Sequence, residues 1–153
     1  MVEEGEFRLP KVHHIGVAVK DVEKAAEFYT DSLGIGPFMF IDVDLPEVTL
    51  YRKPTPLRLK VGMAQMGDTL LELIQALDEG SPPWNLVYRK GEGLYHLGFL
   101  VDDIKHALNH LEKKGFSLIE EGGHGENKFA FVSCEQCGDV IFELMQLEPG
   151  LIP

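Results

Sequence analysis

The sequence predicts an α+β fold made of two tandem copies of one half-domain. The first observation behind this prediction is a long repeat, in which a predicted strand runs directly into a predicted helix twice. A shift of 82 residues (96 − 14 = 82) aligns His14 with His96 and Asp21 with Asp103. A period of this length is typical of a duplicated half-domain and not of a solenoid of short repeats.

The second observation is that the last predicted strand of each half repeats as well. Residues 67–75 read GDTLLELIQ and residues 138–146 read GDVIFELMQ, a match at a shift of 71 residues (143 − 72 = 71). This register aligns Glu72 with Glu143. Each half is therefore expected to carry a histidine on its first strand and a glutamate on its last strand.

The first half is expected to begin with a strand over residues 12–19, whose alternation separates His14 from the branched apolar residues. A helix is predicted over residues 22–33, because Asp21 is a favourable N-cap and Gly34 a favourable stop. Its apolar stripe must cover one face of the sheet.

Four further strands are predicted in the first half, over residues 38–43, 47–51, 57–65 and 70–74. A loop is expected at Pro46 and a tight turn at residues 67–68. The large apolar residues of segment 57–65 are assigned to the face that the helix covers. This assignment leaves Arg58 and Lys60 on the opposite face, together with Glu72.

The second half repeats this plan after a connection that is expected to contain a short helical turn around Trp84. A strand is predicted from Tyr95, and a helix capped by Asp103 follows. A glycine-rich loop around His124 then leads to the last two strands. The predicted segments are 76–93 for the connection, 104–114 for the helix, and 128–133 and 139–146 for the strands.

Composition suits one domain with a substantial core, because the 153 residues are 44% hydrophobic. The predicted domain spans residues 11–147, with halves at about 11–76 and 94–147 and a loosely held arm before them. The formal charge of −11 argues against nucleic acid and against an anionic membrane as partners, because both require a basic surface. No apolar run is long enough to span a bilayer, and a cytoplasmic location is expected.

The face opposite the predicted helices carries two histidines and two glutamates among glycine and alanine. Burying four such side chains without a partner is unfavourable, whereas one divalent ion satisfies all of them. Two imidazoles and two carboxylates suit Zn, Ni, Co, Mn or Fe(II) with two coordination positions left open. The predicted metal ligands are His14, Glu72, His96 and Glu143.

The two cysteines and His13 are of residue types that can bind metal, but the sequence predicts no functional role for them. Cys134 and Cys137 form a CxxC pair without a second pair or matching histidines, so we expect them to lie in a turn. His13 points to the opposite face from His14 in an alternating strand, which predicts that it takes no part in the site.

At this point the chain resembles the vicinal oxygen chelate superfamily, which includes glyoxalase I, extradiol dioxygenases, methylmalonyl-CoA epimerases and bleomycin-resistance proteins. The resemblance covers about residues 11–147 and implies two βαβββ modules that form one cupped mixed sheet around the metal ion. It assigns the four ligand positions to the same two histidines and two glutamates.

Within the superfamily the chain is most similar to the methylmalonyl-CoA epimerases, in the segments 23–29, 67–73, 81–82, 101–104 and 124–125 together with His96. This resemblance implies a metal-dependent epimerase that acts on a 2-methylmalonyl-type acyl-CoA thioester through a metal-stabilised enolate, and a homodimer. The alternatives are a glyoxalase I-like lactoylglutathione lyase and, less favoured because all four ligand positions are filled, a non-catalytic small-molecule-binding protein.

This resemblance does not identify the residue that acts as the general base. Lys60 stands where a carboxylate is expected on the strand before the first ligand glutamate. Glu143 or Glu72 could then serve as the catalytic base, with Glu47 as a weaker choice. Lys60 and Arg58 are predicted instead to bind a carboxylate or phosphate of the substrate.

Overall fold

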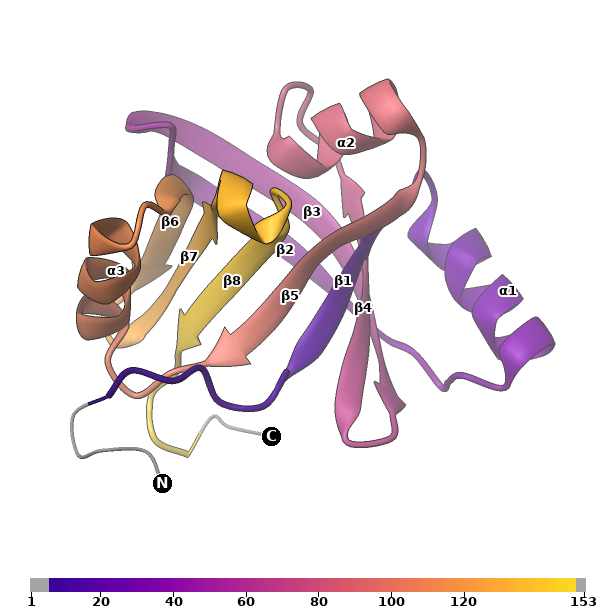
Figure 1. Cartoon of the computed structure of the whole chain (residues 1–153). Coiled ribbons are helices and arrows are strands. Elements are labelled where there is room, and N and C mark those ends of the chain that lie inside the picture. Colours follow the sequence, from indigo (N-terminus) through magenta and orange to yellow (C-terminus); the bar gives the residue numbers. More distant parts are fainter. Residues whose placement is uncertain (1–5, 151–153) are drawn as a thin grey trace.

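The computed structural model describes residues 6–150 and confirms the predicted α+β fold class (Figure 1). Each module contains a strand, a helix and three strands, and a further helix joins the modules. The strands are β1 His14–Ala18, β2 Met39–Leu50, β3 Lys53–Met66, β4 Thr69–Ala76, β5 Gly93–Leu100, β6 Ser117–His124, β7 Asn127–Ser133 and β8 Ile141–Gln146. The helices are α1 Val22–Leu33, α2 Pro82–Lys90 and α3 Ile104–Lys113, with a 3-10 turn η1 Glu135–Cys137.

The eight strands form one mixed sheet in the order β1-β4-β3-β2-β6-β7-β8-β5, which closes into a barrel. The modules meet at two seams. At one seam β1 pairs antiparallel with β5, and at the other the end of β2 pairs with β6 through Thr49 and Leu50. Within each module the first and last strands are parallel, as β1 is to β4 and β5 is to β8.

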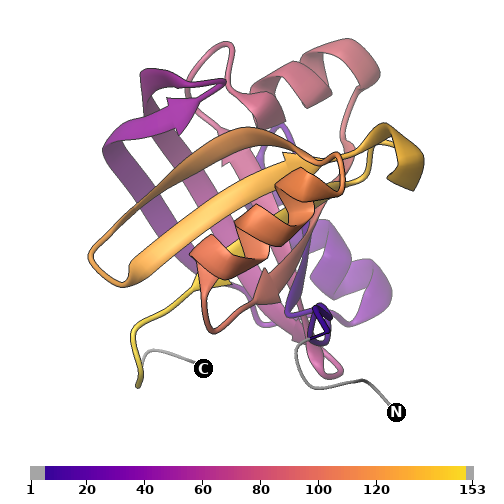
Figure 2. The ribbon, with the colours of Figure 1, turned by 60° about the vertical axis from the view of Figure 1, so that its left-hand side comes forward.

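Two helices cover the outside of the barrel and the third covers one end (Figures 1 and 2). Helix α1 buries Val22 and Ala26 against Leu71 and Leu73 of β4. Helix α3 packs in the same way on β7 and β8, where Leu144 is fully buried. Helix α2 lies over the end formed by β1, β4 and β5. The interior of the barrel is thus left for a separate cluster that includes Ala18, Ile74, Tyr95 and Phe131.

The helix boundaries follow the capping residues. Asp21 accepts hydrogen bonds from the backbone N–H groups of Glu23 and Lys24, and Gly34 ends α1 in the left-handed conformation with φ 68°. Asp103 accepts from the N–H of His106 at the start of α3. The boundaries predicted for α1 are confirmed, and the end of α3 lies one residue earlier than predicted.

The two short strands predicted around Pro46 are one continuous strand, β2. Pro46 has no N–H group to donate to a neighbouring strand, and it lies at an irregularity between Leu45 and Val48 where the pairing with β3 shifts register. Strand β6 was not predicted, because its sequence ends in the glycine-rich segment that reads as a loop.

The two faces of β3 are the reverse of those predicted. Val61 pairs with Ile74 and Met63 with Glu72, so the large apolar residues of β3 share the interior face with the predicted ligand Glu72. Small residues lie under α1 instead, since a Cβ at Gly62 would be 3.3 Å from Val22 Cγ2. The prediction failed because the barrel interior is itself apolar, and a large apolar face therefore does not identify the helix-covered side.

The N-terminal segment is better packed than predicted for a loosely held arm. Phe7 and Leu9 contact the core beneath α3, and the Phe7 ring stacks on His110 with ring centroids 4.3 Å apart. The first five residues of the predicted arm lie outside the described residues. Within residues 6–150 no helix combines the length and apolar character needed to cross a membrane, and the cytoplasmic location stays a prediction.

Candidate metal centre

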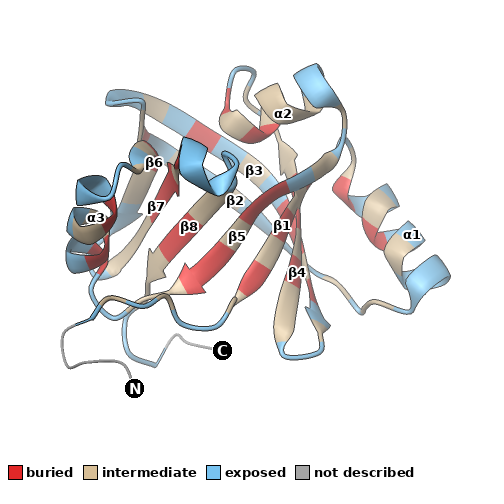
Figure 3. Ribbon diagram, in the orientation of Figure 1, coloured by how far each residue is buried: buried red, intermediate tan, exposed pale blue. Residues whose placement is uncertain are grey.

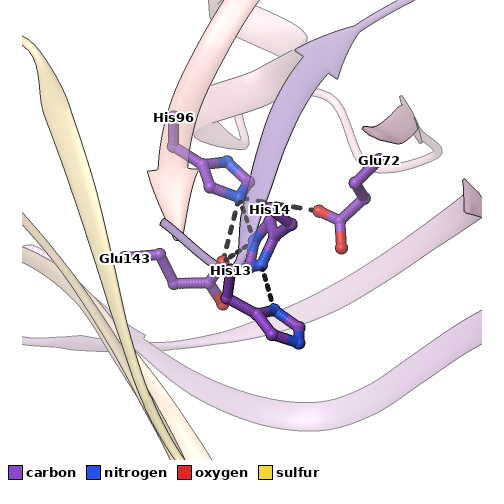
Figure 4. A network of polar contacts seen from close by, with 5 residues as sticks. All are labelled: His13, His14, Glu72, His96 and Glu143. Carbon is purple, nitrogen blue, oxygen red and sulfur yellow. Dashed lines mark hydrogen bonds and ion pairs between the residues drawn. The ribbon is translucent and has the colours of Figure 1, made fainter. Parts of the chain in front are cut away.

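Four neighbouring strands deliver the four predicted ligands to one point inside the barrel (Figure 4). Their ligand atoms all lie within 4.8 Å of one another. The two histidines and Glu143 are buried and Glu72 is half-buried. Figure 3 shows buried stretches, in red, along β1, β5 and β8. The residues and their strands are Glu72 on β4, His14 on β1, His96 on β5 and Glu143 on β8.

The spacing of the ligand atoms fits a divalent cation. His14 Nε2 lies 2.9 Å from His96 Nε2 and 2.8 Å from Glu143 Oε2, and His96 Nε2 lies 2.9 Å from the same oxygen. Two atoms bound at right angles to an ion at about 2.1 Å are about 3 Å apart, which matches these distances. Glu72 Oε1 lies farther out, 3.6 Å from His96 Nε2.

Burial and the neighbouring charges shift the pKa values of three of the four predicted ligands. Burial alone would raise the pKa of Glu143, but its hydrogen bonds with His14 and His96 and their positive charge lower that pKa to about 2. Burial would lower the pKa of His14, yet its hydrogen bond with Glu143 raises it above the usual value. Burial and the charge of Glu143 raise the pKa of Glu72. A bound divalent cation would relieve the burial of both carboxylates at once.

Residues 13–131 match the family model of the Glyoxalase/Bleomycin resistance protein/Dioxygenase superfamily. The chain belongs to this superfamily. The match spans most of the chain, and it confirms the resemblance stated from the sequence motifs.

The relatives of this chain include methylmalonyl-CoA epimerases. The mitochondrial methylmalonyl-CoA epimerase of Mus musculus is 34% identical over 146 residues, which cover 92% of this chain and 75% of the mouse protein. The crystal structure of methylmalonyl-CoA epimerase from Mycobacterium tuberculosis aligns with a TM-score of 0.70 at 22% identity and covers 94% of this chain and 91% of that chain. A methylmalonyl-CoA epimerase in complex with methylmalonyl-CoA and NH4+ gives the same TM-score at 22% identity, over 95% of this chain and all of that chain. These similarities support an enzyme with epimerase-like activity.

A cavity of about 230 Å³ opens beside the cluster of two histidines and two glutamates. Aliphatic residues of the first module form one wall and aromatic residues of the second module form another. Glu72, His96 and Glu143 of the cluster reach its surface, and no lysine or arginine of the described residues lines it. The apolar residues around it are Val43, Leu45, Leu57, Leu59, Val61, Ile74, Pro83, Phe129 and Phe131.

Arg58 and Lys60, the predicted substrate-binding residues, do not line this cavity. Both side chains are exposed on the outer face of β3, because Leu59, the residue between them, points inward. Arg58 is held there by Asp78, with its Nη2 2.9 Å from Asp78 Oδ1. The prediction that these cations share a face with the ligands is therefore wrong. Glu47 is also exposed, on β2.

His13 contacts the cluster, contrary to the prediction from strand alternation. Its Nδ1 lies 2.9 Å from Nδ1 of His14, so a proton on one of the two nitrogens is shared in a hydrogen bond (Figure 4). Strand β1 begins only at His14, and alternation does not apply to the residue before it. A hydrogen bond at Nδ1 holds the ring of His14 with Nε2 toward the cluster.

Sequence reasoning missed one acidic residue that lines the cavity. Glu120 on β6 is 2% exposed and lies beside the aromatic wall. Simple alternation along β6 would place it on the outer face with Leu118, so the pattern alone gives no signal for it. By contrast, the expected turn position of Cys134 and Cys137 is confirmed, since both lie at η1 as free thiols.

Proposed function

We propose that this protein is a metal-dependent epimerase that acts on a 2-methylmalonyl-type acyl-CoA thioester. The observation that carries the proposal is the convergence of His14, Glu72, His96 and Glu143 beside a largely apolar cavity, whose surface Glu72, His96 and Glu143 reach. The 34% identity to the mouse methylmalonyl-CoA epimerase supports the substrate class. The proposed cofactor is one divalent ion per chain, which could be Co, Zn, Ni, Mn or Fe.

The cavity suits the acyl end of such a substrate. Its volume of about 230 Å³ is too small for the whole of coenzyme A, since sites for drug-sized ligands measure about 300–1,000 Å³. The aliphatic wall of Val43, Leu45 and Leu59 can contact the methyl substituent. Because no lysine or arginine of the described residues lines the cavity, the cluster is the place where the substrate carboxylate would find positive charge.

The reaction requires removal and return of the proton on the carbon between the carboxylate and the thioester. A divalent cation held by the four side chains would stabilise the negative charge that develops on the thioester oxygen. Glu72 and Glu143 are the proposed proton-transfer groups within the cluster. Of the two, Glu143 is fixed by both histidines, whereas Glu72 lies 3.6 Å from His96 and is freer to turn toward substrate.

The proposal is tested by proton exchange in deuterated water. Purified protein is stripped of metal, reloaded with Co²⁺ or Zn²⁺ and incubated with methylmalonyl-CoA, and deuterium at the α carbon is followed by NMR. We expect metal-dependent deuterium incorporation that is lost in Glu143→Gln. Glu27→Gln is the control, because this exposed carboxylate on α1 lies outside the cavity and should leave the exchange unchanged.

The alternative activity has its own outcome. A glyoxalase I-like lyase is expected to use the same two histidines and two glutamates, so metal binding alone does not separate the two functions. Absence of exchange with methylmalonyl-CoA in a fully metal-loaded protein would reject the epimerase. The hemithioacetal of glutathione and methylglyoxal would then be the substrate to assay. Failure to bind any metal would favour a non-catalytic binding protein.

A homodimer is part of the proposal. Large apolar side chains are exposed on β2, where Met39 and Phe40 are 63% and 50% exposed, and such surfaces suit contact between two copies. Light scattering coupled to size-exclusion chromatography would give the mass of the assembly. A mass near the 17.1 kDa of one chain would reject the dimer.

A further inference from the structure

Glu120 is a buried carboxylate that faces the cavity without belonging to the ligand cluster. Its residue is 2% exposed, and its Oε2 has no hydrogen-bond partner within residues 6–150. Burying a carboxylate without a partner is strongly unfavourable. A side chain kept in this state at the surface of a cavity points to a role toward the molecule that fills the cavity.

A β-bulge aims this side chain into the barrel. Leu118 pairs with Val132 on the outer face, beneath α3, and the next pair is Glu120 with Phe131 on the inner face. Ile119 is the extra residue between these pairs. The bulge therefore shifts the alternation of β6 by one position and turns Glu120 inward, as bulges beside active sites often do.

The position of Glu120 is across the cavity from the cluster. Glu120 pairs with Phe131, and Phe131 pairs with Glu143, so the two carboxylates share one face and lie two strands apart. Two strand spacings place their Cα atoms about 10 Å apart. Strand β6 is four positions from β1 in the closed order of eight strands, which is the opposite side of the barrel from His14. A substrate held at the cluster would lie between Glu143 and Glu120.

Inversion of a carbon centre requires that the proton leave from one face and return to the other. The cluster can serve one face, and the other polar side chains that line the cavity are Glu120 and Tyr95. Burial and the charge of Glu120 raise the pKa of the Tyr95 phenol well above its usual value, so this group stays protonated and cannot be the base. Glu120 is therefore the remaining side chain of the described cavity wall that can accept a proton.

We infer that Glu120 is a catalytic residue that exchanges the α-proton on the substrate face turned away from the cluster. This inference rests on the proposed function. In one direction the ionised carboxylate takes the proton from carbon, the electron pair of the C–H bond passes into the enolate, and a protonated carboxyl group of the cluster gives its proton to the other face and becomes ionised. In the reverse direction protonated Glu120 donates its proton. No other reactant is consumed.

The ionisation of Glu120 suits this role. Burial, together with the negative charge of Glu143, raises the pKa of Glu120 from 4.5 to about 7. A proton-transfer group is most effective when its pKa lies near the operating pH, because both its protonated and its ionised forms are then available.

The test follows each epimer separately. The metal-loaded protein and its Glu120→Gln variant are incubated in deuterated water with pure (2R)- or pure (2S)-methylmalonyl-CoA. We expect wild type to label and interconvert both epimers. In the variant, interconversion should fall by about 100-fold or more, while deuterium still enters one epimer without inversion, through the base on the cluster side. Glu120→Asp should recover part of the interconversion.

The matched control is Glu121→Gln, because Glu121 is the next residue of β6 and pairs with Ala130 on the outer face. It should keep wild-type interconversion. Bound metal per chain is measured in every variant. Interconversion by Glu120→Gln within about threefold of wild type would overturn the inference, and so would equal loss of labelling from both epimers at full metal content. If wild type labels neither epimer, the proposed function fails first, and this result differs from any defect limited to the variant.

Discussion

Gly98 lies directly opposite His14 in the antiparallel pair of β1 and β5, and the imidazole of His14 occupies the space where a Cβ at residue 98 would lie. The relationship is reciprocal, because Gly16 lies opposite His96 and a Cβ there would overlap the ring of His96. Each module thus supplies one histidine of the candidate metal centre and the glycine that makes room for the histidine of the other module. The repeated glycines are a steric requirement of the cluster.

Gly98→Ala is expected to displace the ring of His14 and so weaken metal binding. Overpacking of a filled interior costs about 1–3 kcal/mol, and we expect a loss of unfolding free energy in this range. Metal affinity should fall by at least about tenfold. Removing a residue that only orients a ligand lowers metal affinity by about 10- to 100-fold, and displacing the ligand itself should cost at least as much. Isothermal titration with Co²⁺ and thermal unfolding in the presence of a chelator measure the two effects.

Gly93→Ala is the matched control for this substitution. Gly93 belongs to the same strand, and a Cβ there would meet no atom within 4 Å. It should bind Co²⁺ like wild type. Equal affinities of the residue 98 variant and wild type would show that the ring of His14 can move aside without leaving the cluster.

His13→Ala should lower metal affinity by about 10- to 100-fold, the range observed when a side chain that orients a ligand is removed. The reason is the 2.9 Å contact between Nδ1 of His13 and Nδ1 of His14, which keeps Nε2 of His14 directed at the cluster. The measurement is competition for Co²⁺ with a chelator of known affinity. His124→Ala removes an exposed histidine of β6 and is the control. A result for His13→Ala inside the error of that control would return His13 to the role of bystander.

The raised pKa of Glu120 predicts that this residue destabilises the folded protein at high pH. The folded carboxyl titrates at about pH 7 and the unfolded one near 4.5, so the folded state holds more protons between these values and stability falls as pH rises. Glu120→Gln removes this penalty. From the size of the pKa shift, the free energy of unfolding at high pH should rise by up to about 3 kcal/mol. The titratable groups that face Glu120 are Tyr95 and Glu143, which the variant retains.

The measurement for this pH effect is urea unfolding of both proteins at pH 5 and pH 8. A chelator is included, because a bound cation would add its own charge to the site. The variant should gain stability relative to wild type on going from pH 5 to pH 8. A difference that does not change with pH would mean that Glu120 titrates near its ordinary value in the folded chain.

The parts of the fold that could be predicted from the sequence rest on local rules. Helix α1 has the predicted bounds because Asp21 and Gly34 satisfy the backbone groups at its two ends. The duplicated plan was visible because the repeat aligns His14 with His96 and Glu72 with Glu143. Strict alternation then placed these residues on one face without knowledge of the tertiary structure.

The failures occur where one extra residue or a second apolar layer changes the local rule. Glu120 was missed because a bulge at Ile119 reverses the faces of β6, and sequence alternation does not show a bulge. Lys60 was assigned to the wrong face of β3 because both faces of this strand meet apolar surroundings, α1 outside and the cavity inside. Only the register against Glu72 decides between the two faces.

The corrected register of β3 gives a direct test with two neighbouring residues. Leu59 lines the cavity and Lys60 is exposed on the outer face. Leu59→Ala should enlarge the space beside the acyl group of the proposed substrate. One methylene is worth about 10- to 200-fold in specificity in an apolar pocket, so we expect kcat/KM for ethylmalonyl-CoA to rise at least tenfold relative to that for methylmalonyl-CoA.

Lys60→Ala should leave both substrates unchanged within about twofold, because an exposed side chain on the far side of the strand contacts neither the acyl group nor the cluster. The ratio of the two kcat/KM values cancels any general loss of folded protein, since Leu59→Ala also removes apolar contacts and lowers stability. The reverse pattern, a defect in Lys60→Ala with an unchanged ratio in Leu59→Ala, would show that the substrate approaches the outer face of β3. The assignment of the cavity as the acyl site would then be wrong, because the two side chains point to opposite sides of one strand.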